Sequence, residues 1–263
     1  MRSGKTGGTA RGGSIQSLNR AFSILEEIAR HEHGLGLVEL SCAVDLHTST
    51  AHHLCKTLLD LGYLSQSESG KRYRIGRGIF ALASSCADEI ELARTARPIL
   101  AELSKSTGES AHFAVWAGNQ VLILERAYSD SAFQMNERAG MLRPAHCTAI
   151  GKALLSGLDP AALDERLEDM ALTPYSPNTM VDKEQLRREI ERIRTDGVAF
   201  DDSEYNEEAR CIAAPVRDFR NRVVGAIGFS GPVWRVSLSD LNKYSALTRE
   251  KSRSLSLALG WRE

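Results

Sequence analysis

Apolar residues recur at helical spacing near the start of the chain. A predicted helix begins at Ser14 and ends in the polar stretch before Gly34. Its apolar face consists of Ile15, Leu18, Phe22, Leu25 and Ile28, with Ala21 and Ala29 on the same side. Because such a face is normally buried against neighbouring elements, the segment is expected to open a folded domain.

Two shorter elements and a hairpin follow this helix. A short helix is predicted over 37–42, and Thr48 or Ser49 is a suitable N-cap for the next, since a hydroxyl can accept from a free backbone N–H group. The apolar stripe of that helix is Ala51, Leu54, Leu58 and Leu61. Residues 62–76 read as two short strands around a Glu-Ser-Gly turn. This order of elements predicts a winged helix-turn-helix domain over residues 14–77.

The second helix of such a pair enters the major groove of DNA, and the hairpin lies beside it. Small residues at the start of the helix allow close approach, and donors then reach base edges and phosphates. The residues expected at DNA are Arg20, Thr48, Ser49, Thr50, His52, His53, Lys56, Lys71, Arg72 and Arg74. The alternative is an amphipathic surface helix without DNA contacts, which makes the short helix and the basic hairpin coincidences.

The pattern from residue 78 to residue 107 is helical again. Pro98 predicts a break between one helix near 78–93 and another near 96–107. Residues 78–94 are therefore a candidate linker helix between two domains. Its apolar residues either pack against a partner subunit or are buried within one chain: Ile79, Leu82, Ile90 and Leu92.

Residues 95–263 alternate between strand and helix patterns and are assigned to a second domain. Strands are predicted in a hairpin around Gly118-Asn119 and near 198–202, 211–216 and 223–230. Helices are predicted near 148–157, 160–170, 182–195 and 237–259, the last capped by Ser237. Antiparallel strands with helices grouped around them indicate an α+β fold of the sensor type.

Composition excludes several classes of protein. Of the 263 residues, 42% are hydrophobic and 25% charged, as in globular proteins. The longest apolar runs, near 211–216 and 223–229, are far short of the roughly 18 residues that span a bilayer. The N-terminus lacks the apolar region of a secretory signal, and five widely spaced cysteines predict neither a disulfide framework nor a zinc site. We therefore expect a cytoplasmic protein with no cofactor, no metal and no membrane partner.

Charge is distributed unevenly along the chain. Residues 1–77 hold 10 Lys and Arg against 7 Asp and Glu, whereas residues 78–263 hold 23 against 27. A mildly basic N-terminal part permits nucleic-acid binding, although a surplus of this size is weak evidence by itself. Residues 1–13 contain three basic and no acidic residues and cannot bury a core. They are expected as a disordered basic tail, either an arm along DNA phosphates or a simple terminus.

Two blocks of motifs carry a family resemblance. The first contains Ser17-Leu18-x-Arg20-Ala21, Ile24-Leu25, Ser49-Thr50-Ala51-His52-x-Leu54, Leu61-Gly62-Tyr63 and Tyr73-Arg74-Ile75-Gly76. The second contains Arg143-Pro144-x-His146-Cys147-Thr148-Ala149-x-Gly151-Lys152-Ala153, Gly197-x-Ala199-x-Asp201-Asp202 and Arg210-Cys211-Ile212-Ala213-Ala214-Pro215-Val216. Over roughly residues 14–260 the chain resembles the IclR family of bacterial transcription factors, the isocitrate lyase regulator type.

The resemblance implies a fold and a function. The winged helix would bind double-stranded operator DNA, and a GAF-like α/β effector-binding domain would bind a small molecule. Members form dimers that often pair into tetramers, and they act as repressors, activators or both. A homo-oligomer, operator DNA and a small-molecule effector are thus the expected partners.

Two positions depart from the family pattern. His53 stands where relatives often carry Arg, so a DNA contact at that site would be weaker and sensitive to pH. Ala209 stands where Gly is usual, and alanine resists a positive φ angle. The loop beside the effector is therefore expected to differ, and the effector with it.

The effector site implied by the resemblance lies at the start of the predicted helix near 148–157, which Thr148 or Cys147 should cap. Free N–H groups at a helix start suit a carboxylate, and Arg143 would add a bidentate partner. The effector-binding residues expected are Arg143, His146, Thr148, Ala149, Ile150, Gly151, Asp201 and Cys211. Small organic acids are the favoured effectors, and a neutral effector is the alternative. Lys152 is expected to face solvent.

Each of these residues also has a plain structural interpretation. On that interpretation Cys211 is a buried structural thiol and His146 is a loop histidine whose hydrogen bonds are satisfied within the protein. Asp201 then caps a turn, and Arg143 is an exposed charged residue. Two other functional classes compete with the regulator. One is a thiol hydrolase that uses Cys211, His146 and Asp201, although no strained nucleophile turn is present. The other is an interaction module that does not bind DNA.

Overall fold

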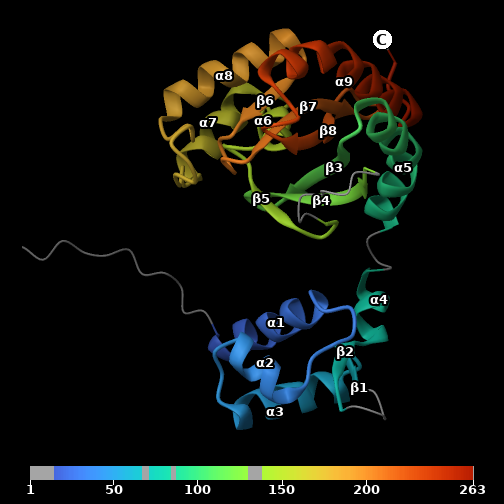
Figure 1. Cartoon of the computed structure of the whole chain (residues 1–263), viewed down its shortest axis with the longest axis vertical. Helices are drawn as coiled ribbons and strands as arrows, with labels where there is room; N and C mark the ends of the chain where they lie inside the picture. Colours follow the sequence, from blue (N-terminus) through green and yellow to red (C-terminus); the bar gives the residue numbers. More distant parts are fainter. Residues whose placement is uncertain (1–14, 67–70, 84–86, 130–137, 263) are drawn as a thin grey trace, which may run out of the picture. The chain divides into compact units, whose positions relative to one another are not determined.

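The computed structural model describes residues 15–66, 71–83, 87–129 and 138–262. The chain divides into two compact units, Met1–Ala87 and Asp88–Glu263, whose elements are labelled in Figure 1. The predicted tail over 1–13 and the turn between the two strands of the wing lie outside the described residues. Among the described helices, none is both long enough and apolar enough to cross a lipid bilayer.

The N-terminal unit has the predicted order of elements. Its helices are α1 (Gln16–Ala29), α2 (Leu37–Ala43), α3 (Thr48–Asp60) and α4 (Arg77–Ala83). Two short antiparallel strands, β1 (Leu64–Gln66) and β2 (Tyr73–Ile75), form the hairpin of the wing. The winged helix-turn-helix prediction is thereby confirmed at the level of the fold.

The predicted cap of α3 is wrong by one or two residues. His47 occupies the N-cap position and makes no side-chain capping bond. Thr48 is already helical, and its hydroxyl lies 3.3 Å from the Ser41 hydroxyl of α2. This contact joins the two helices of the helix-turn-helix pair, so the hydroxyl has a tertiary partner in place of a backbone one.

The predicted apolar face of α1 is only partly buried. Ile24 and Ile28 are in the core with Leu40, Cys55 and Leu58, together with Leu35, Leu64 and Tyr73. By contrast, Ile15, Leu18 and Phe22 are more than half exposed, as is Leu61 at the end of α3. Helical periodicity locates an apolar face, but it does not say whether the same chain covers it.

The C-terminal unit is built on one antiparallel sheet. Its strands are β3 (Ser110–Ala117), β4 (Gln120–Ala127), β5 (Leu142–Pro144), β6 (Ala199–Asp202), β7 (Ala209–Arg217) and β8 (Val223–Pro232). They run in the order β5-β4-β3-β8-β7-β6. The predicted hairpin is confirmed, because Ala117 pairs with Gln120 across Gly118-Asn119. The short strand β5 is not among the predicted strands.

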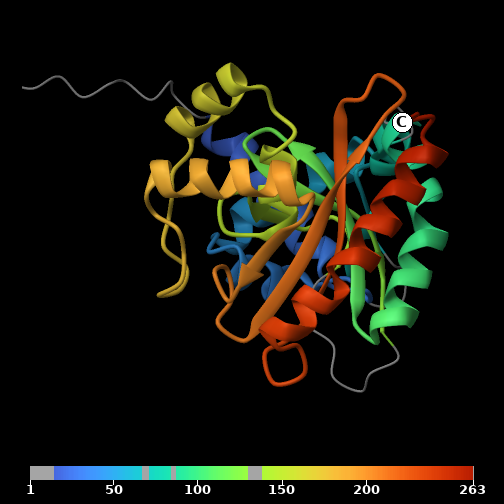
Figure 2. The same ribbon diagram turned by 90° about the horizontal axis from the view of Figure 1, so that it is seen from above.

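Helices cover both faces of this sheet, as Figure 2 shows. They are α5 (Ala87–Thr107), α6 (Ala149–Leu155), α7 (Pro160–Asp169), α8 (Lys183–Asp196) and α9 (Leu238–Ala258). One core joins the sheet to α6, α7 and α8, and the other joins it to α5 and α9. Strand alternation separates the two, because Ala114 and Ala213 face the first core while Phe113 and Ile212 face the second. Ser237 caps α9 as predicted.

The predicted break at Pro98 is wrong, because α5 continues through it. The Pro98 ring is on an exposed side of the helix, where water can hydrogen-bond to the carbonyl group that loses its partner. The opposite side buries Ala96, Leu100 and Leu103 in the core, which offsets the lost bond. The single helix predicted over 78–93 is likewise replaced by α4 and the first turns of α5, and residues 84–86 lie outside the described chain.

Candidate functional site

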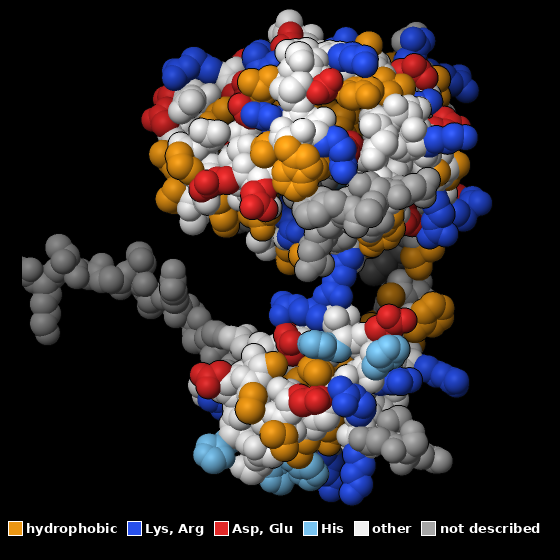
Figure 3. Space-filling view, in the orientation of Figure 1, with side chains coloured by type: hydrophobic (Ala, Val, Ile, Leu, Met, Phe, Trp, Pro, Cys, Tyr) orange, Lys and Arg blue, Asp and Glu red, His pale blue; other side chains and the backbone are white. Residues whose placement is uncertain are grey.

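The outer face of α3 carries the predicted DNA-reading residues. Ala51, Cys55 and Leu58 face the core of the unit. The helical repeat therefore turns Ser49, His52, His53 and Lys56 outward, where all four are exposed, while Thr48 is exposed and Thr50 half-buried at its start. Figure 3 shows histidine and basic side chains gathered over this edge of the unit. DNA contact by these residues stays a prediction.

The basic residues of the wing differ in their surroundings. Lys71 and Arg74 are exposed. The Arg72 guanidinium donates two bonds to the Gly34 carbonyl, of 3.2 and 3.0 Å, and another of 2.9 Å to the Glu39 carboxylate. Arg72 thus ties the wing to the start of α2, so its predicted phosphate contact competes with a structural role. Arg20 is half-buried and lies on α1, so it belongs neither to α3 nor to the wing.

A cavity of about 240 Å³ lies in the C-terminal unit, on the α6 face of the sheet. It is lined by His112, Ile123, Arg143, Thr148, Ala149, Ile150, Asp201, Tyr205, Asn206, Ala209 and Cys211. Six of the eight predicted effector residues are therefore brought together here, and His146 and Gly151 are not among them. The cavity is large enough for a small organic molecule.

Thr148 opens α6 at the edge of the cavity. Its hydroxyl accepts from the Gly151 N–H at 3.2 Å, which confirms the predicted cap, and donates to the Pro144 carbonyl at 2.7 Å. Gly151 does not line the cavity, and it packs so closely that a Cβ there would lie 2.3 Å from the Ala145 backbone. The helix has seven residues, so its dipole is short.

His146 is the other predicted residue that lies outside the lining. It is almost fully buried, and its Nε2–H donates to the Thr173 carbonyl at 3.0 Å. Burial lowers the pKa of this imidazole, and the nearby Lys152 charge lowers it further. The plain structural interpretation of His146 therefore holds, and the trio of Cys211, His146 and Asp201 is not assembled around the cavity.

Arg143 brings a positive charge to the cavity from β5. Its side chain is buried, and one Nη donates to the Leu142 carbonyl at 3.0 Å. The guanidinium also lies over the Tyr205 ring, 5.3 Å from its centroid. A cation held in this way in a buried wall favours an anionic ligand. The alternative of an exposed charge is wrong.

Asp201 brings a carboxyl group to the same cavity from β6. It pairs with Cys211 of β7 across the sheet, and its Oδ1 accepts from the Glu204 N–H at 2.7 Å. Burial raises the pKa of Asp201 to about 7, while the Lys152 charge opposes this rise. The carboxyl group can therefore accept or donate a hydrogen bond near neutral pH.

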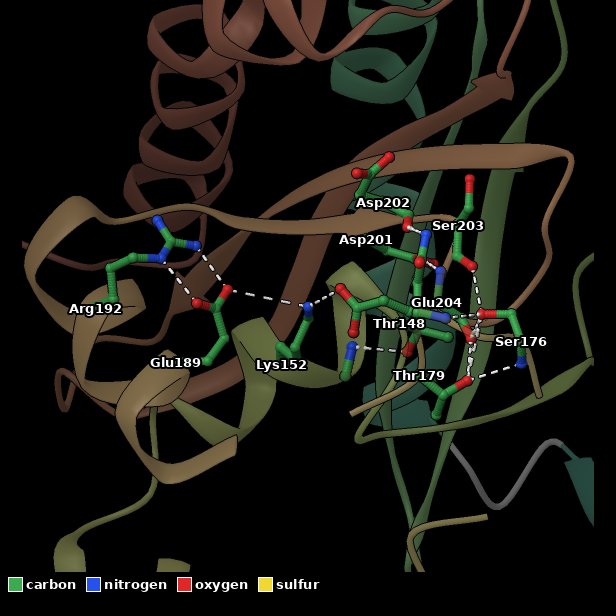
Figure 4. Close-up of polar contacts among 12 residues, drawn as sticks. Thr148, Lys152, Ser176, Thr179, Glu189, Arg192, Asp201, Asp202, Ser203 and Glu204 are labelled. Carbon is green, nitrogen blue, oxygen red and sulfur yellow. Dashed lines mark hydrogen bonds and ion pairs between the residues drawn. The ribbon is translucent and has the colours of Figure 1, made fainter. Parts of the chain in front are cut away.

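Lys152 contradicts the expectation of a solvent-facing residue, because its exposed fraction is 0%. Its Nζ lies 2.5 Å from Glu204 Oε1 and 4.0 Å from Glu189 Oε1. Figure 4 draws both contacts as dashed lines. The side chain projects from α6 toward α8 and the segment after β6, so this lysine lies inside the unit and not on its surface. A buried ammonium requires such carboxylate partners.

Ala209 agrees with the expectation that alanine resists a positive φ angle. It is the first residue of β7, pairs with Pro232 and has no positive φ angle, so an alanine fits without strain. The positive φ angle in this region is at Ser203, with φ of 59°.

Several lining residues are not among the predicted effector contacts. His112 and Ile123 come from β3 and β4, and Tyr205, Asn206 and Ala209 from the segment between β6 and β7 and the start of β7. His112 could have been found as a polar residue in an apolar strand, on the same face as Ala114. Nothing in the sequence marks Tyr205 and Asn206, since their position depends on the turn. The described residues contain no group of three or more His, Cys, Asp or Glu that could hold a metal ion.

Comparisons with known proteins agree for both units. The family "Bacterial transcriptional regulator IclR C-terminal" matches residues 84–257, and the family "IclR helix-turn-helix domain" matches residues 17–68. The regulator XynR of Escherichia coli is 31% identical over 94% of this chain and 98% of its own length. The regulator BhcR of Paracoccus denitrificans is 32% identical over 99% and 94%. The crystal structure of Thermotoga maritima IclR matches with a TM-score of 0.75 and 26% identity over 93% of this chain and 99% of that one.

Proposed function

This chain belongs to the IclR family of bacterial transcriptional regulators, and from that premise we propose that a small organic acid in the C-terminal cavity controls its affinity for operator DNA. The family consists of helix-turn-helix regulators with a C-terminal effector domain, and its members are not enzymes. The proposal adds the chemical class of the effector, the residues that bind it and the oligomeric state.

The proposal of an acid effector rests on one observation, the buried Arg143 side chain in the lining of the cavity. The cavity holds a buried guanidinium beside the start of α6, and a carboxylate can form two parallel bonds with such a group. His112 and Thr148 line the same space and offer further polar atoms. A neutral effector would make no use of the guanidinium charge, whereas an acid gains a charge-assisted bond from it.

The function is tested by a gel shift on the DNA upstream of the gene for this protein, with random DNA at equal salt for comparison. The panel is glycolate, benzoate and gluconate, each paired with its amide. We expect a specific complex that one acid changes and its amide does not. Equal effects of an acid and its amide would contradict an acid effector, and equal binding to random DNA would contradict operator recognition.

Replacing Arg143 with Met should weaken binding of the active acid about tenfold to a hundredfold, because the variant loses a charge-assisted pair. Binding of the neutral analogues should stay unchanged. Thermal shift titrations of both proteins measure this difference. Arg166→Met is the matched control, since Arg166 lies over the Trp116 ring and outside the cavity. An acid that stabilises R143M as much as the parent protein would remove Arg143 from the site.

A second copy of the chain is the proposed partner of the N-terminal unit. Apolar residues of α1, the end of α3 and α4 line a groove of about 360 Å³ there: Leu18, Ala21, Phe22, Leu25, Leu54, Leu58, Leu61, Ile79 and Leu82. Four of them are more than half exposed within one chain: Leu18, Phe22, Leu61 and Leu82. A two-fold operator needs two reading heads, and an isologous contact through this groove would supply both.

Replacing Phe22 with Asp should therefore weaken self-association by about thirtyfold or more, because it puts a charge at an apolar contact. Sedimentation velocity over a range of concentrations measures this change. Val38→Asp is the matched control, since Val38 is 66% exposed on α2 and does not line the groove. If F22D and V38D sediment alike, the groove is not the contact between copies.

A further inference from the structure

Lys152 lies behind the wall of the cavity and is not part of its lining. It extends from α6 to the segment that follows β6, where its ammonium meets the Glu204 carboxylate at 2.5 Å. The next two residues along the chain, Tyr205 and Asn206, line the cavity directly. The Glu204 side chain is thus bound to Lys152 on the side of the wall away from the cavity. Tyr205 and Asn206 form the side that faces the cavity.

The same residue is connected to Asp201. The Glu204 backbone N–H donates to Asp201 Oδ1 at 2.7 Å, which orients the carboxyl group that faces the cavity. Anything that moves Glu204 therefore changes two parts of the site together, the aromatic wall at Tyr205 and the carboxyl group of Asp201.

The outer side of this turn is held by a separate set of bonds. Ser176 Oγ donates to the Ser203 carbonyl at 2.6 Å, and Thr179 Oγ1 donates to the Glu204 carbonyl at 2.6 Å. The Tyr175 ring packs against the Tyr205 ring, with 5.1 Å between the ring centroids. Figure 4 shows these hydroxyl groups on one side of the turn and Lys152 on the other. The ammonium therefore holds the Glu204 carboxylate, whereas the hydroxyl groups hold the backbone carbonyl groups of Ser203 and Glu204.

We infer that Lys152 is a positioning residue of the effector cavity, and that through Glu204 it fixes the turn over residues 203–206 and the carboxyl group of Asp201. The inference rests on the proposed function, because it assigns a role within the effector site. It adds a residue that touches no effector yet controls how well the cavity accepts one.

Electrostatics support this role. Burial raises the pKa of Asp201 to about 7, and Lys152 is the largest influence that opposes the rise. The charged and titratable groups around Asp201 are Lys152, Cys147, Glu204, His112, Arg143, Tyr205 and Cys211. Lys152 lowers the pKa of Asp201 and the Glu204 charge raises it, and the effect of Lys152 is the larger. Replacing both residues removes both effects. The pKa of Asp201 should then rise further.

The test uses the full chain with both partners replaced, in the variant K152M/E204M. Replacing both charges by apolar groups of similar size avoids an unpaired buried charge, so the protein should fold. Glu189 stays paired in this variant, because Arg192 donates to it at 2.9 and 2.7 Å. Lys183→Met is the matched control, since Lys183 pairs with Glu168 at 2.9 Å on the surface of the same unit.

Hydrogen exchange gives the first readout and needs no effector. In the parent protein the Glu204 amide is bonded to Asp201 and should exchange slowly. In K152M/E204M the amides of residues 203–206 should exchange about tenfold faster or more, while the strands β3 and β8 keep their protection. K183M should match the parent protein throughout.

Alkylation of Cys211 gives the second readout, since this thiol lines the cavity. Its sulfur attacks the methylene carbon of iodoacetate or iodoacetamide, iodide leaves, and the thiol proton passes to water. The ratio of the iodoacetate rate to the iodoacetamide rate at Cys211, found by peptide mass spectrometry, reports whether the cavity favours an anion. Ionisation of the thiol itself affects both reagents and cancels in the ratio.

We expect this ratio to fall as pH rises through about 7 in the parent protein, because ionised Asp201 repels iodoacetate. The fall should disappear in D201N, and its midpoint should shift to higher pH in K152M/E204M. The role of Lys152 would be overturned if two properties of K152M/E204M match the parent protein. These are the amide exchange rates of residues 203–206 and the pH at which the alkylation ratio falls. If the iodoacetate-to-iodoacetamide ratio at Cys211 does not exceed the ratio for free cysteine at any pH, the acid effector is contradicted instead, and hydrogen exchange still decides on Lys152.

Discussion

Replacing Lys152 alone with Met should lower the free energy of unfolding of the C-terminal unit by about 3–5 kcal/mol. The variant leaves Glu204 in a site where its side chain is 7% exposed and its closest cation is gone. Burial already raises the pKa of Glu204, and without Lys152 the carboxylate must either remain unpaired or take up a proton. Both outcomes favour the unfolded chain, where water solvates the charge.

Urea denaturation followed by tryptophan fluorescence measures this loss. All three tryptophans, Trp116, Trp234 and Trp261, lie in the C-terminal unit, so the signal reports that unit alone. The double variant K152M/E204M should recover most of the lost stability, because neither charge remains in the core. The surface variant K183M should change stability by less than about 1 kcal/mol. A K152M protein as stable as K183M would mean that Glu204 finds another partner or water.

The recovery expected for the double variant separates stability from positioning. If Lys152 served only to neutralise Glu204, removing both would restore the cavity along with the fold. The positioning role requires the opposite for residues 203–206, which should stay mobile in the stable double variant. Stability and hydrogen exchange measured on the same proteins therefore distinguish the two roles.

Local patterns predicted most of the elements in this chain. The β3–β4 hairpin follows from apolar alternation around Gly118-Asn119, and Ser237 marks the start of α9 because its hydroxyl can bond the third residue of the helix. The helix-turn-helix pair and the wing have equally local signals. Errors at Pro98 and at the cap of α3 arose where tertiary contacts outweighed a local preference.

The candidate site was predictable only where a residue is positioned by its own element. Thr148 and Cys211 are positioned in this way, by a helix cap and a predicted strand, whereas Arg143 lies on the unpredicted strand β5 and was indicated by the family resemblance. Tyr205 and Asn206 directly follow Ser203 and Glu204, whose carbonyl groups accept bonds from Ser176 and Thr179, more than twenty residues away in the chain. No spacing rule connects those segments, so their contribution to the cavity was not visible in sequence.

Burial of Lys152 was missed for a related reason. Its helix has apolar neighbours on every side, including Ala149, Ile150, Ala153 and Leu154, all of them buried. A helix without a polar face is an internal helix, and a lysine within it must have an internal partner. The opposite error concerns Phe22, because periodicity predicts a buried face there and the unit leaves the ring exposed.

Replacing Thr50 and His53 with Ala should weaken binding to the operator by about 1–3 kcal/mol for each base that is no longer read, or roughly 5- to 150-fold per base. Binding to random DNA should change little. Both residues lie on α3, Thr50 near its start and His53 on its exposed side, where a reading helix meets base edges. Fluorescence anisotropy on operator and random duplexes at several salt concentrations measures both affinities.

The wing provides the matched comparison. Lys71 and Arg74 are exposed basic residues, so K71A/R74A should weaken binding to both duplexes about equally and reduce the salt slope by roughly one per phosphate contact. Arg72 is left intact because it holds the wing to Gly34 and Glu39, and its removal would mix folding with binding. These two outcomes would assign discrimination between operator and random DNA to α3 and affinity for any DNA to the wing. If both variants weaken binding by the same factor on both duplexes, α3 does not read bases and another element must carry the specificity.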